Sequence, residues 1–262
     1  MKAPSFAKAR CRTFRTTRRS PKFIWEGEWS AVLNLQNIEA GYGESMVVRH
    51  VNLLVKPGQI VCLMGRNGVG KSTLMKSIMG LIKPKSGSIQ YNERDITSFP
   101  PDRRAKAGIG YVPQGREIFP QLTVEENLML GLEAATDGRK KLPDSLFDTF
   151  PVLRQMLHRK GGDLSGGQQQ QLAIARALAP GPKLLLLDEP MEGIQPSIVM
   201  EIEAIIEAIK RSREIAVLLV EQSLEFATSI ADYYYVIDRG TVAAEGHAEQ
   251  LNEEQVRKHL TV

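Results

Sequence analysis

Short apolar runs alternate with segments of helical spacing from about Val32 onward. Runs over residues 59–65, 184–188, 215–220 and 233–238 have the length of strands, and the second and third are apolar almost throughout. Strands without an alternating polar face are buried on both sides, as in parallel sheets covered by helices. Helical patterns fall between these runs. The alternation therefore predicts an α/β fold with a mainly parallel sheet and helices on both faces.

Two helices have clear start signals. Thr123 is followed three residues later by Glu126, which predicts a capping box that opens a helix over residues 124–134. Pro196 predicts the start of another helix. Its isoleucines recur at helical spacing, at Ile198, Ile202, Ile205, Ile206 and Ile209. Residues 136–163 are polar and interrupted by prolines and glycines, so we expect helix there only in short pieces.

Charge is distributed unevenly along the 262 residues. Residues 1–30 hold eight Lys or Arg against Glu26 and Glu28, so they contribute +6 to a net charge of +4, and the remainder carries −2. A slightly acidic body gives no global reason to expect nucleic acid as a partner. The basic head is Arg-rich and acid-poor, like a transit peptide, but has no amphipathic pattern. We expect a disordered extension, or residues added by an upstream start codon, before a single domain over 31–262. A weak attraction of this head to anionic lipid or nucleic acid stays open.

Two cysteines, Cys11 and Cys62, make neither a disulfide framework nor a set of metal ligands, so a reducing compartment fits. No apolar run approaches the length of a membrane span. We therefore expect that the chain does not cross a membrane by itself.

Residues 65–72 match the phosphate-loop pattern G-x-x-x-x-G-K-[ST], with an apolar strand before it and a helical pattern after it. The helix is expected to run to about Leu81, before Pro84 stops it. Glycines let backbone N–H groups surround phosphates, Lys71 would reach the β- and γ-phosphates, and the Ser72 hydroxyl would hold Mg²⁺. A glycine loop that merely turns the chain is the alternative. The expected nucleotide-binding residues are Gly65, Arg66, Asn67, Gly68, Val69, Gly70, Lys71, Ser72 and Thr73.

Two carboxylates follow the most apolar strand. Asp188 ends the run LLLLD, which places it at the carboxyl edge of the sheet, where it would hold Mg²⁺ directly or through water. Glu189 follows at the mouth of the site and would polarise the attacking water. An Asp-Glu-Pro sequence after a strand can also be a simple turn. The phosphate loop makes the functional interpretation the better one.

A second helix start suited to an anion lies in LSGGQQQQLAIARAL, residues 164–178. Ser165 can cap this helix, and Gln168 stands where a capping box has Glu or Gln. Gly166 and Gly167 would let a ligand come close to the backbone. An ordinary capped helix explains the serine and the glutamine but not the paired glycines.

Four motifs, GRNGVGKST, YVPQG, LSGGQQQ and LLLLDEP, resemble in order and spacing the ATP-binding cassette (ABC) subunits of membrane transporters. The resemblance runs from about Val32 to the C-terminus. It implies a P-loop NTPase fold with an N-terminal antiparallel β part and a helical insertion at about 115–163. It also implies ATP and Mg²⁺ as cofactors and a head-to-tail dimer, in which the signature residues Ser165, Gly166, Gly167 and Gln168 serve the partner's ATP.

The resemblance implies roles for two further residues. Tyr42, in AGYGES, would stack on adenine, although it could also be only a turn aromatic. Gln114 would sense Mg²⁺ and the γ-phosphate and couple them to the insertion, whose surface would grip the membrane subunits.

Two positions depart from the usual cassette pattern. Met191 stands where Thr is usual, and we assign it no consequence. Gln222 stands where many cassettes have a switch histidine. Its amide can donate to a γ-phosphate oxygen but cannot titrate near neutral pH. We expect Gln222 to act with Glu189 in catalysis, with a solvated glutamine at a strand end as the alternative.

The segments VEQ, EGIQPS and YVPQGREIFPQLTVEENL resemble ATPase subunits of bacterial importers for branched-chain amino acids and urea, the urea type most of all. The resemblance implies urea uptake, with branched-chain amino acids or short amides as the alternative. It implies a related but distinct second ATPase, two membrane permease subunits, a periplasmic substrate-binding protein, and a place at the cytoplasmic face of the inner membrane. Cassettes of DNA repair and ribosomes form the other class. A single cassette with a short insertion favours transport.

Overall fold

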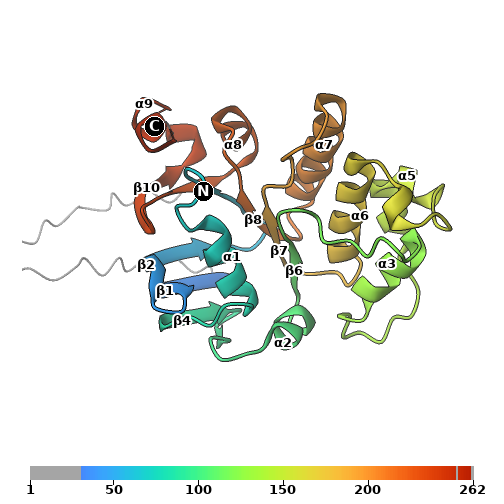
Figure 1. Cartoon of the computed structure of the whole chain (residues 1–262), viewed down its shortest axis with the longest axis horizontal. Coiled ribbons are helices and arrows are strands. Elements are labelled where there is room, and N and C mark those ends of the chain that lie inside the picture. The colour runs from blue at the N-terminus through green and yellow to red at the C-terminus, as the bar shows by residue number, and fades with distance from the viewer. Residues whose placement is uncertain (1–30, 252, 261–262) are drawn as a thin grey trace, which may run out of the picture.

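The computed structural model describes residues 31–251 and 253–260. The predicted basic extension, residues 1–30, lies outside the described residues, as does Cys11. Within the described part of the chain, no helix has both the length and the apolar character needed to cross a membrane. Figure 1 shows the described chain as two sheets with helices around them.

An antiparallel sheet forms the N-terminal part of the fold, with strand order β2-β1-β4-β5. Its strands are β1 (Leu33–Tyr42), β2 (Ser45–Val55), β4 (Ser86–Tyr91) and β5 (Arg94–Asp95). This sheet agrees with the antiparallel β part that the family resemblance implies.

The second sheet has six strands in the order β10-β9-β3-β8-β7-β6. Its strands are β3 (Ile60–Met64), β6 (Ile109–Val112), β7 (Leu184–Asp188), β8 (Ala216–Val220), β9 (Tyr233–Asp238) and β10 (Thr241–His247). All neighbours pair in parallel except β10, which pairs antiparallel with β9. Val220 lies opposite both Leu63 and Asp188. This register brings the carboxyl ends of β3, β7 and β8 together, so the loops that follow them share one edge.

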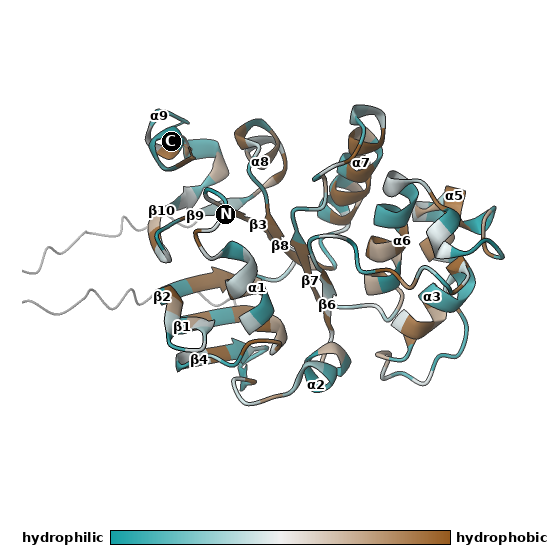
Figure 2. Ribbon diagram, viewed as in Figure 1, coloured by the Kyte–Doolittle hydropathy of each residue, from teal (hydrophilic) through white to brown (hydrophobic). Residues whose placement is uncertain are grey.

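The parallel sheet is buried on both faces. Leu184 and Leu186 pack with the antiparallel sheet and α1 (Lys71–Met79), whereas Leu185 and Leu187 pack with helices on the opposite face. Those helices are α6 (Gly166–Leu178), α7 (Pro196–Ser212) and α8 (Leu224–Ile230). Figure 2 shows the apolar colour concentrated in these central strands. The fully apolar runs were therefore correctly predicted as strands covered on two sides.

A group of helices between β6 and α6 corresponds to the predicted insertion. Its elements are α3 (Val124–Leu132), α4 (Asp144–Thr149), α5 (Pro151–Arg154) and the 3₁₀ turn η1 (Gly161–Asp163). The capping box between Thr123 and Glu126 is present in both directions. The helical pieces within 136–163 are short, as predicted. The remaining helical elements are α2 (Pro101–Lys106), η2 (Ala248–Gln250) and α9 (Glu253–Leu260).

The helix after the phosphate loop ends earlier than we predicted. Gly80 adopts φ +82°, and Leu81 donates its N–H back to the carbonyl of Lys76, which closes the helix after Met79. A left-handed glycine cap, rather than Pro84, thus terminates α1.

Candidate functional site

Three glycines of the phosphate loop hold backbone conformations that other residues rarely adopt. Gly65, Gly68 and Gly70 have φ values of +148°, +79° and +111°. At Gly65 a β-carbon would lie 2.4 Å from the carbonyl oxygen of Ile237. The loop therefore needs glycine for its shape. In loops of this kind, successive backbone N–H groups can line a concave site for an anion.

Lys71 is 4% exposed and lies inside this loop. Its ammonium donates to the carbonyl oxygens of Gly65 at 2.7 Å and Arg66 at 2.9 Å, and it lies 3.5 Å from Oε1 of Glu189. The cation is thus held at the centre of the loop, between backbone acceptors and a buried carboxylate.

Ser72 and Asp188 meet across the sheet edge, with the serine hydroxyl donating to Oδ1 of the aspartate at 3.2 Å. Asp188 is 1% exposed, and its Oδ2 has no hydrogen-bond partner. Burial raises the pKa of Asp188 to about 6, although the hydrogen bond from Ser72 lowers it. A buried carboxylate oxygen without a partner beside a hydroxyl suits a hard cation such as Mg²⁺, which binds few protein ligands and keeps water and phosphate oxygens.

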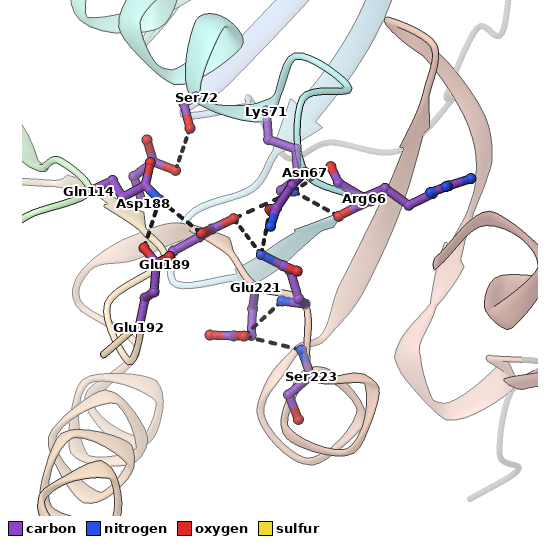
Figure 3. Close-up of polar contacts among 12 residues, drawn as sticks. Arg66, Asn67, Lys71, Ser72, Gln114, Asp188, Glu189, Glu192, Glu221 and Ser223 are labelled. Atoms are coloured by element: carbon purple, nitrogen blue, oxygen red, sulfur yellow. Dashed lines mark hydrogen bonds and ion pairs between the residues drawn. The ribbon is translucent and has the colours of Figure 1, made fainter. Parts of the chain in front are cut away.

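Glu189 is 9% exposed and has φ +50°, a strained value for a residue with a side chain. Its Oε2 accepts from Nε2 of Gln114 at 3.3 Å, and its Oε1 accepts from Nε2 of Gln222 at 2.9 Å. Figure 3 shows this carboxylate among the side chains from the loops after β3, β6 and β7. With Lys71 at 3.5 Å, the carboxylate is held from three directions.

The amide of Gln222 also reaches the phosphate loop, donating to Oδ1 of Asn67 at 2.8 Å. It therefore links the loop after β8 to both the loop after β3 and the carboxylate after β7. Gln222 is exposed to solvent, yet its amide is held by these two hydrogen bonds; its role in catalysis stays a prediction.

The signature segment begins α6 with the predicted cap. Gln168 donates its N–H to the Ser165 hydroxyl at 3.3 Å, and Ser165 donates its N–H to Oε1 of Gln168 at 3.0 Å. The body of α6 packs on the sheet face opposite α1, and Figure 1 shows it grouped with α3 and α5. The residues of the phosphate loop, by contrast, lie at the start of α1.

The structure corrects one argument about the paired glycines. A β-carbon on Gly167 would lie 2.2 Å from Cγ2 of Ile198 in α7, so close helix packing accounts for this glycine. At Gly166 the nearest atoms are the guanidinium tip of Arg116, at 3.1 Å, which can move aside. Of the two signature glycines, Gly166 is the one whose presence close packing does not explain.

A family model described as ABC transporter matches residues 48–192. The chain belongs to the ABC transporter family. Its activity is that of an ABC ATPase, in which ATP hydrolysis is coupled to transport. ABC ATPase domains bind ATP and work as dimers with membrane permease subunits.

Several relatives share most of their length with this ABC ATPase. A high-affinity branched-chain amino acid transport ATP-binding protein of Pseudomonas aeruginosa is 40% identical over 212 residues, 80% of this chain and 91% of that protein. A probable branched-chain amino acid transport ATP-binding protein of Archaeoglobus fulgidus is 39% identical over 86% and 95%. A lipopolysaccharide export system ATP-binding protein of Haemophilus influenzae is 37% identical over 87% and 96%.

Solved ABC cassettes have the same fold. An ATP-binding cassette of an ABC transporter superposes with a TM-score of 0.74 at 29% identity, covering 89% of this chain and all of that one. A dimeric post-hydrolysis cassette bound to ADP and phosphate gives a TM-score of 0.73 at 27% identity, covering 84% of this chain and all of that one. These likenesses confirm the predicted P-loop NTPase fold with mixed sheets and helices.

Two acidic residues of this ABC ATPase take part in the site without having been predicted. Glu192 accepts from Nε2 of Gln114 at 2.6 Å. Glu221 accepts the N–H groups of Gln222 at 2.7 Å and Ser223 at 3.1 Å, while burial raises its pKa. Glu192 lies in the segment EGIQPS and Glu221 in VEQ, both close in sequence to predicted site residues. Their closeness to predicted site residues in the sequence could have made them candidates. Sequence position alone, however, does not show in which direction a side chain on a loop points.

Tyr42 ends β1 and is 53% exposed. The hairpin that carries Tyr42 packs closely on the phosphate loop. A β-carbon added at Gly70 would lie only 3.2 Å from Cγ1 of Val47 in β2. Tyr42 thus projects from an element next to the phosphate loop of this ABC ATPase.

Proposed function

We propose that this chain is the ATPase subunit of an importer for branched-chain amino acids or a closely related small solute. Two relatives at 40% and 39% identity are named for branched-chain amino acid transport, and this observation carries the proposal. The urea interpretation rested on short motifs, and these relatives favour the amino acid alternative over it. The export relative, at 37% identity, makes lipopolysaccharide the competing cargo.

The ATP site of the proposal is the loop at the start of α1. The backbone N–H groups of residues 65–73 would surround the phosphates, and Lys71 would leave its carbonyl acceptors to contact the β- and γ-phosphates. Tyr42, exposed on the neighbouring hairpin, would stack on the adenine ring. The convergence of Lys71, Asp188 and Glu189 at one sheet edge supports this assignment.

Mg²⁺ would be held by Ser72, Gln114 and Asp188. The unpartnered Oδ2 of Asp188 and the adjacent serine hydroxyl fit such an ion. When bound, Mg²⁺ neutralises charge on the phosphates during phosphoryl transfer.

Glu189 would orient and polarise the water that attacks the γ-phosphate. Its carboxylate is buried and fixed by the amides of Gln114 and Gln222, so it needs little rearrangement before accepting a hydrogen bond from water. The Gln222 amide keeps the carboxylate beside the phosphate loop through Asn67. Neither amide titrates, so the two donors keep the same charge near neutral pH.

The signature residues Ser165, Gly166, Gly167 and Gln168 would act on the ATP of a head-to-tail partner. The body of α6 packs opposite α1 in its own chain, which supports a role in trans. A helix N-terminus with a serine cap offers backbone and hydroxyl donors to a γ-phosphate. The partner would be a related, distinct ATPase chain.

The membrane subunits would dock on the insertion, residues 115–163. Large apolar side chains are exposed there at Phe119, Met129 and Leu130, and exposed apolar side chains are typical of binding surfaces. Two permease subunits would hold the ATPase at the cytoplasmic face of the cell membrane. A periplasmic protein would select the substrate, which this chain would not contact.

Two variants separate the roles of the phosphate loop and the signature helix. Glu189→Gln keeps the shape but loses the carboxylate, so ATP binds uncleaved and the dimer with the partner ATPase accumulates. Ser165→Arg puts a bulky cation at the helix start, so each monomer binds ATP but the dimer cannot close. Size-exclusion chromatography with MgATP should give a dimer for the first and nucleotide-bound monomers for the second. Loss of ATP binding by isolated Ser165→Arg would contradict the head-to-tail arrangement.

The cargo is tested by uptake. Cells lacking the chain are supplied with the parent or with Glu189→Gln, and uptake of labelled leucine and labelled urea is measured. We expect leucine uptake to return only with the parent. Recovery of urea uptake alone would overturn the amino acid proposal but leave the ATPase assignment standing.

A further inference from the structure

The amide of Gln114 faces two carboxylates at once. Its Nε2 lies 2.6 Å from Oε2 of Glu192 and 3.3 Å from Oε2 of Glu189. The amide nitrogen is a donor and a carboxylate oxygen an acceptor, so the NH₂ group of Gln114, and not its carbonyl oxygen, points toward both acids. The amide oxygen is consequently turned away from both acids. Gln114 thus contacts the residue that directly follows Asp188, the carboxylate to which Ser72 donates (Figure 3).

We propose that Glu192 is a positioning residue that fixes the amide of Gln114, so that its carbonyl oxygen is offered to the metal beside Asp188. The inference rests on the proposed function, in which Gln114 is a metal ligand. A glutamine amide has two orientations of nearly equal shape, and only its hydrogen-bond partners decide between them. Only one of these orientations presents an oxygen to a cation.

Glu192 provides the stronger of the two restraints on this amide. The contact to Glu189 is long, at 3.3 Å, and the Glu189 carboxylate is shared with Gln222 and Lys71. The contact to Glu192 is short, at 2.6 Å, and of the charge-assisted kind. Without Glu192, the amide would keep only the longer contact.

Glu189 and Glu192 lie on the same backbone turn. The N–H of Glu192 donates to the carbonyl oxygen of Glu189 at 3.2 Å, which closes a turn directly after β7. Gly193 follows with φ +66°. One hydrogen-bonded turn therefore carries both Glu189, proposed to polarise water, and Glu192, which contacts the amide of Gln114. The orientation of the metal ligand is thus tied to the position of Glu189.

The inference is tested by the contribution of metal to nucleotide binding. The affinity of the purified full chain for a non-hydrolysable ATP analogue is measured by calorimetry, with and without Mn²⁺. The ratio of the two affinities isolates the metal contacts. Glu192→Ala should reduce this ratio about fivefold, the effect of losing one hydrogen bond, and leave the affinity without metal unchanged. Glu192→Gln, which keeps the side chain's size but lets the amide pair flip, should give a smaller reduction.

Glu201→Ala is the matched control. Glu201, in α7, also accepts a glutamine amide at 2.6 Å, from Gln171, but takes no part in the phosphate site. This variant should leave the ratio unchanged. Gln114→Ala should reduce the ratio, and adding Glu192→Ala to it should reduce it no further, because the two residues act as one unit.

The outcomes separate this inference from the proposed function. A reduced ratio in Gln114→Ala together with an unchanged ratio in both Glu192 variants would overturn the inference and leave the metal site intact. An unchanged ratio in Gln114→Ala would remove Gln114 from the metal ligands and overturn the inference with it. If the reductions of the ratio were additive in the double variant, Glu192 would act independently of Gln114, and its positioning role would be wrong. Failure of the parent to bind the analogue would instead contradict the proposed ATP site.

Discussion

The amide nitrogen of Gln222 lies 2.9 Å from Oε1 of Glu189, at the position where many cassettes have a histidine. A histidine there would gain or lose a proton near neutral pH, whereas the amide stays neutral. Residue 222 of this chain therefore contributes no change of charge near neutral pH.

Replacing Gln222 by His should make hydrolysis depend on pH. The new imidazole would lie beside the carboxylate of Glu189, and its protonation would change the charge next to the γ-phosphate. ATP turnover of the complex with the partner ATPase should acquire a step between about pH 6 and 7 that the parent lacks. Gln222→Met, which has similar length and no titrating group, is the control. Identical profiles for the parent and the His variant would show that residue 222 does not approach the phosphate.

Asp188 should make the free energy of unfolding fall as pH rises. Its pKa is raised from 3.8 to about 6, so the folded state binds more protons than the unfolded state between these values. Stability is therefore lost through this window and stays lower above it. Asp188→Asn removes the effect and should be more stable than the parent by about 3 kcal/mol at pH 7, with no gain below about pH 4. Urea unfolding in EDTA measures it, and a pH-independent difference would contradict this origin.

The paired glycines of the signature should respond differently to alanine. At Gly167 the new β-carbon would overlap Ile198, so Gly167→Ala should lower stability by about 1–3 kcal/mol. At Gly166 the new β-carbon meets only the guanidinium tip of Arg116. Gly166→Ala should therefore change the free energy of unfolding by no more than about 0.5 kcal/mol, but it should form less of the ATP-bound dimer. Thermal melting and sizing with the partner ATPase make the comparison. Equal melting temperatures for the two variants would refute the packing account of Gly167.

Arg104 should be a major determinant of stability despite its charge. It is 1% exposed, and its guanidinium donates at 2.7–2.9 Å to the carbonyl oxygens of Phe99, Thr97, Ser77 and Ile78. The last two belong to the final turn of α1, where a cation is favourable. Burial lowers its pKa to about 10, so it stays charged at neutral pH.

Replacing Arg104 by Met keeps the volume but leaves buried carbonyls without donors, at a cost of about 3 kcal/mol. Urea unfolding should show this loss, whereas Arg103→Met, at the exposed neighbouring position, should change stability little. A loss of similar size in both variants would argue against the buried hydrogen bonds as its cause.

Much of the fold, and the position of the phosphate loop, were predictable because their signals are local. The apolar runs predicted strands buried on both faces, and the sequence from Thr123 to Glu126 predicted a helix start that the structure contains. The phosphate-loop pattern predicted where Lys71 and Ser72 begin a helix. In each case a few consecutive residues decide the conformation by sterics, capping or burial.

Tertiary structure decided which side chains meet. No local pattern shows that Gln114 bonds to Glu192, that Gln222 reaches Asn67, or that Gly167 lies under Ile198. These contacts join loops and helices separated by 31 to 155 positions in the chain. The two polar contacts exist because the parallel strands β3, β6, β7 and β8 end at one sheet edge, where their loops meet. The contact of Gly167 with Ile198 comes instead from the packing of α6 against α7.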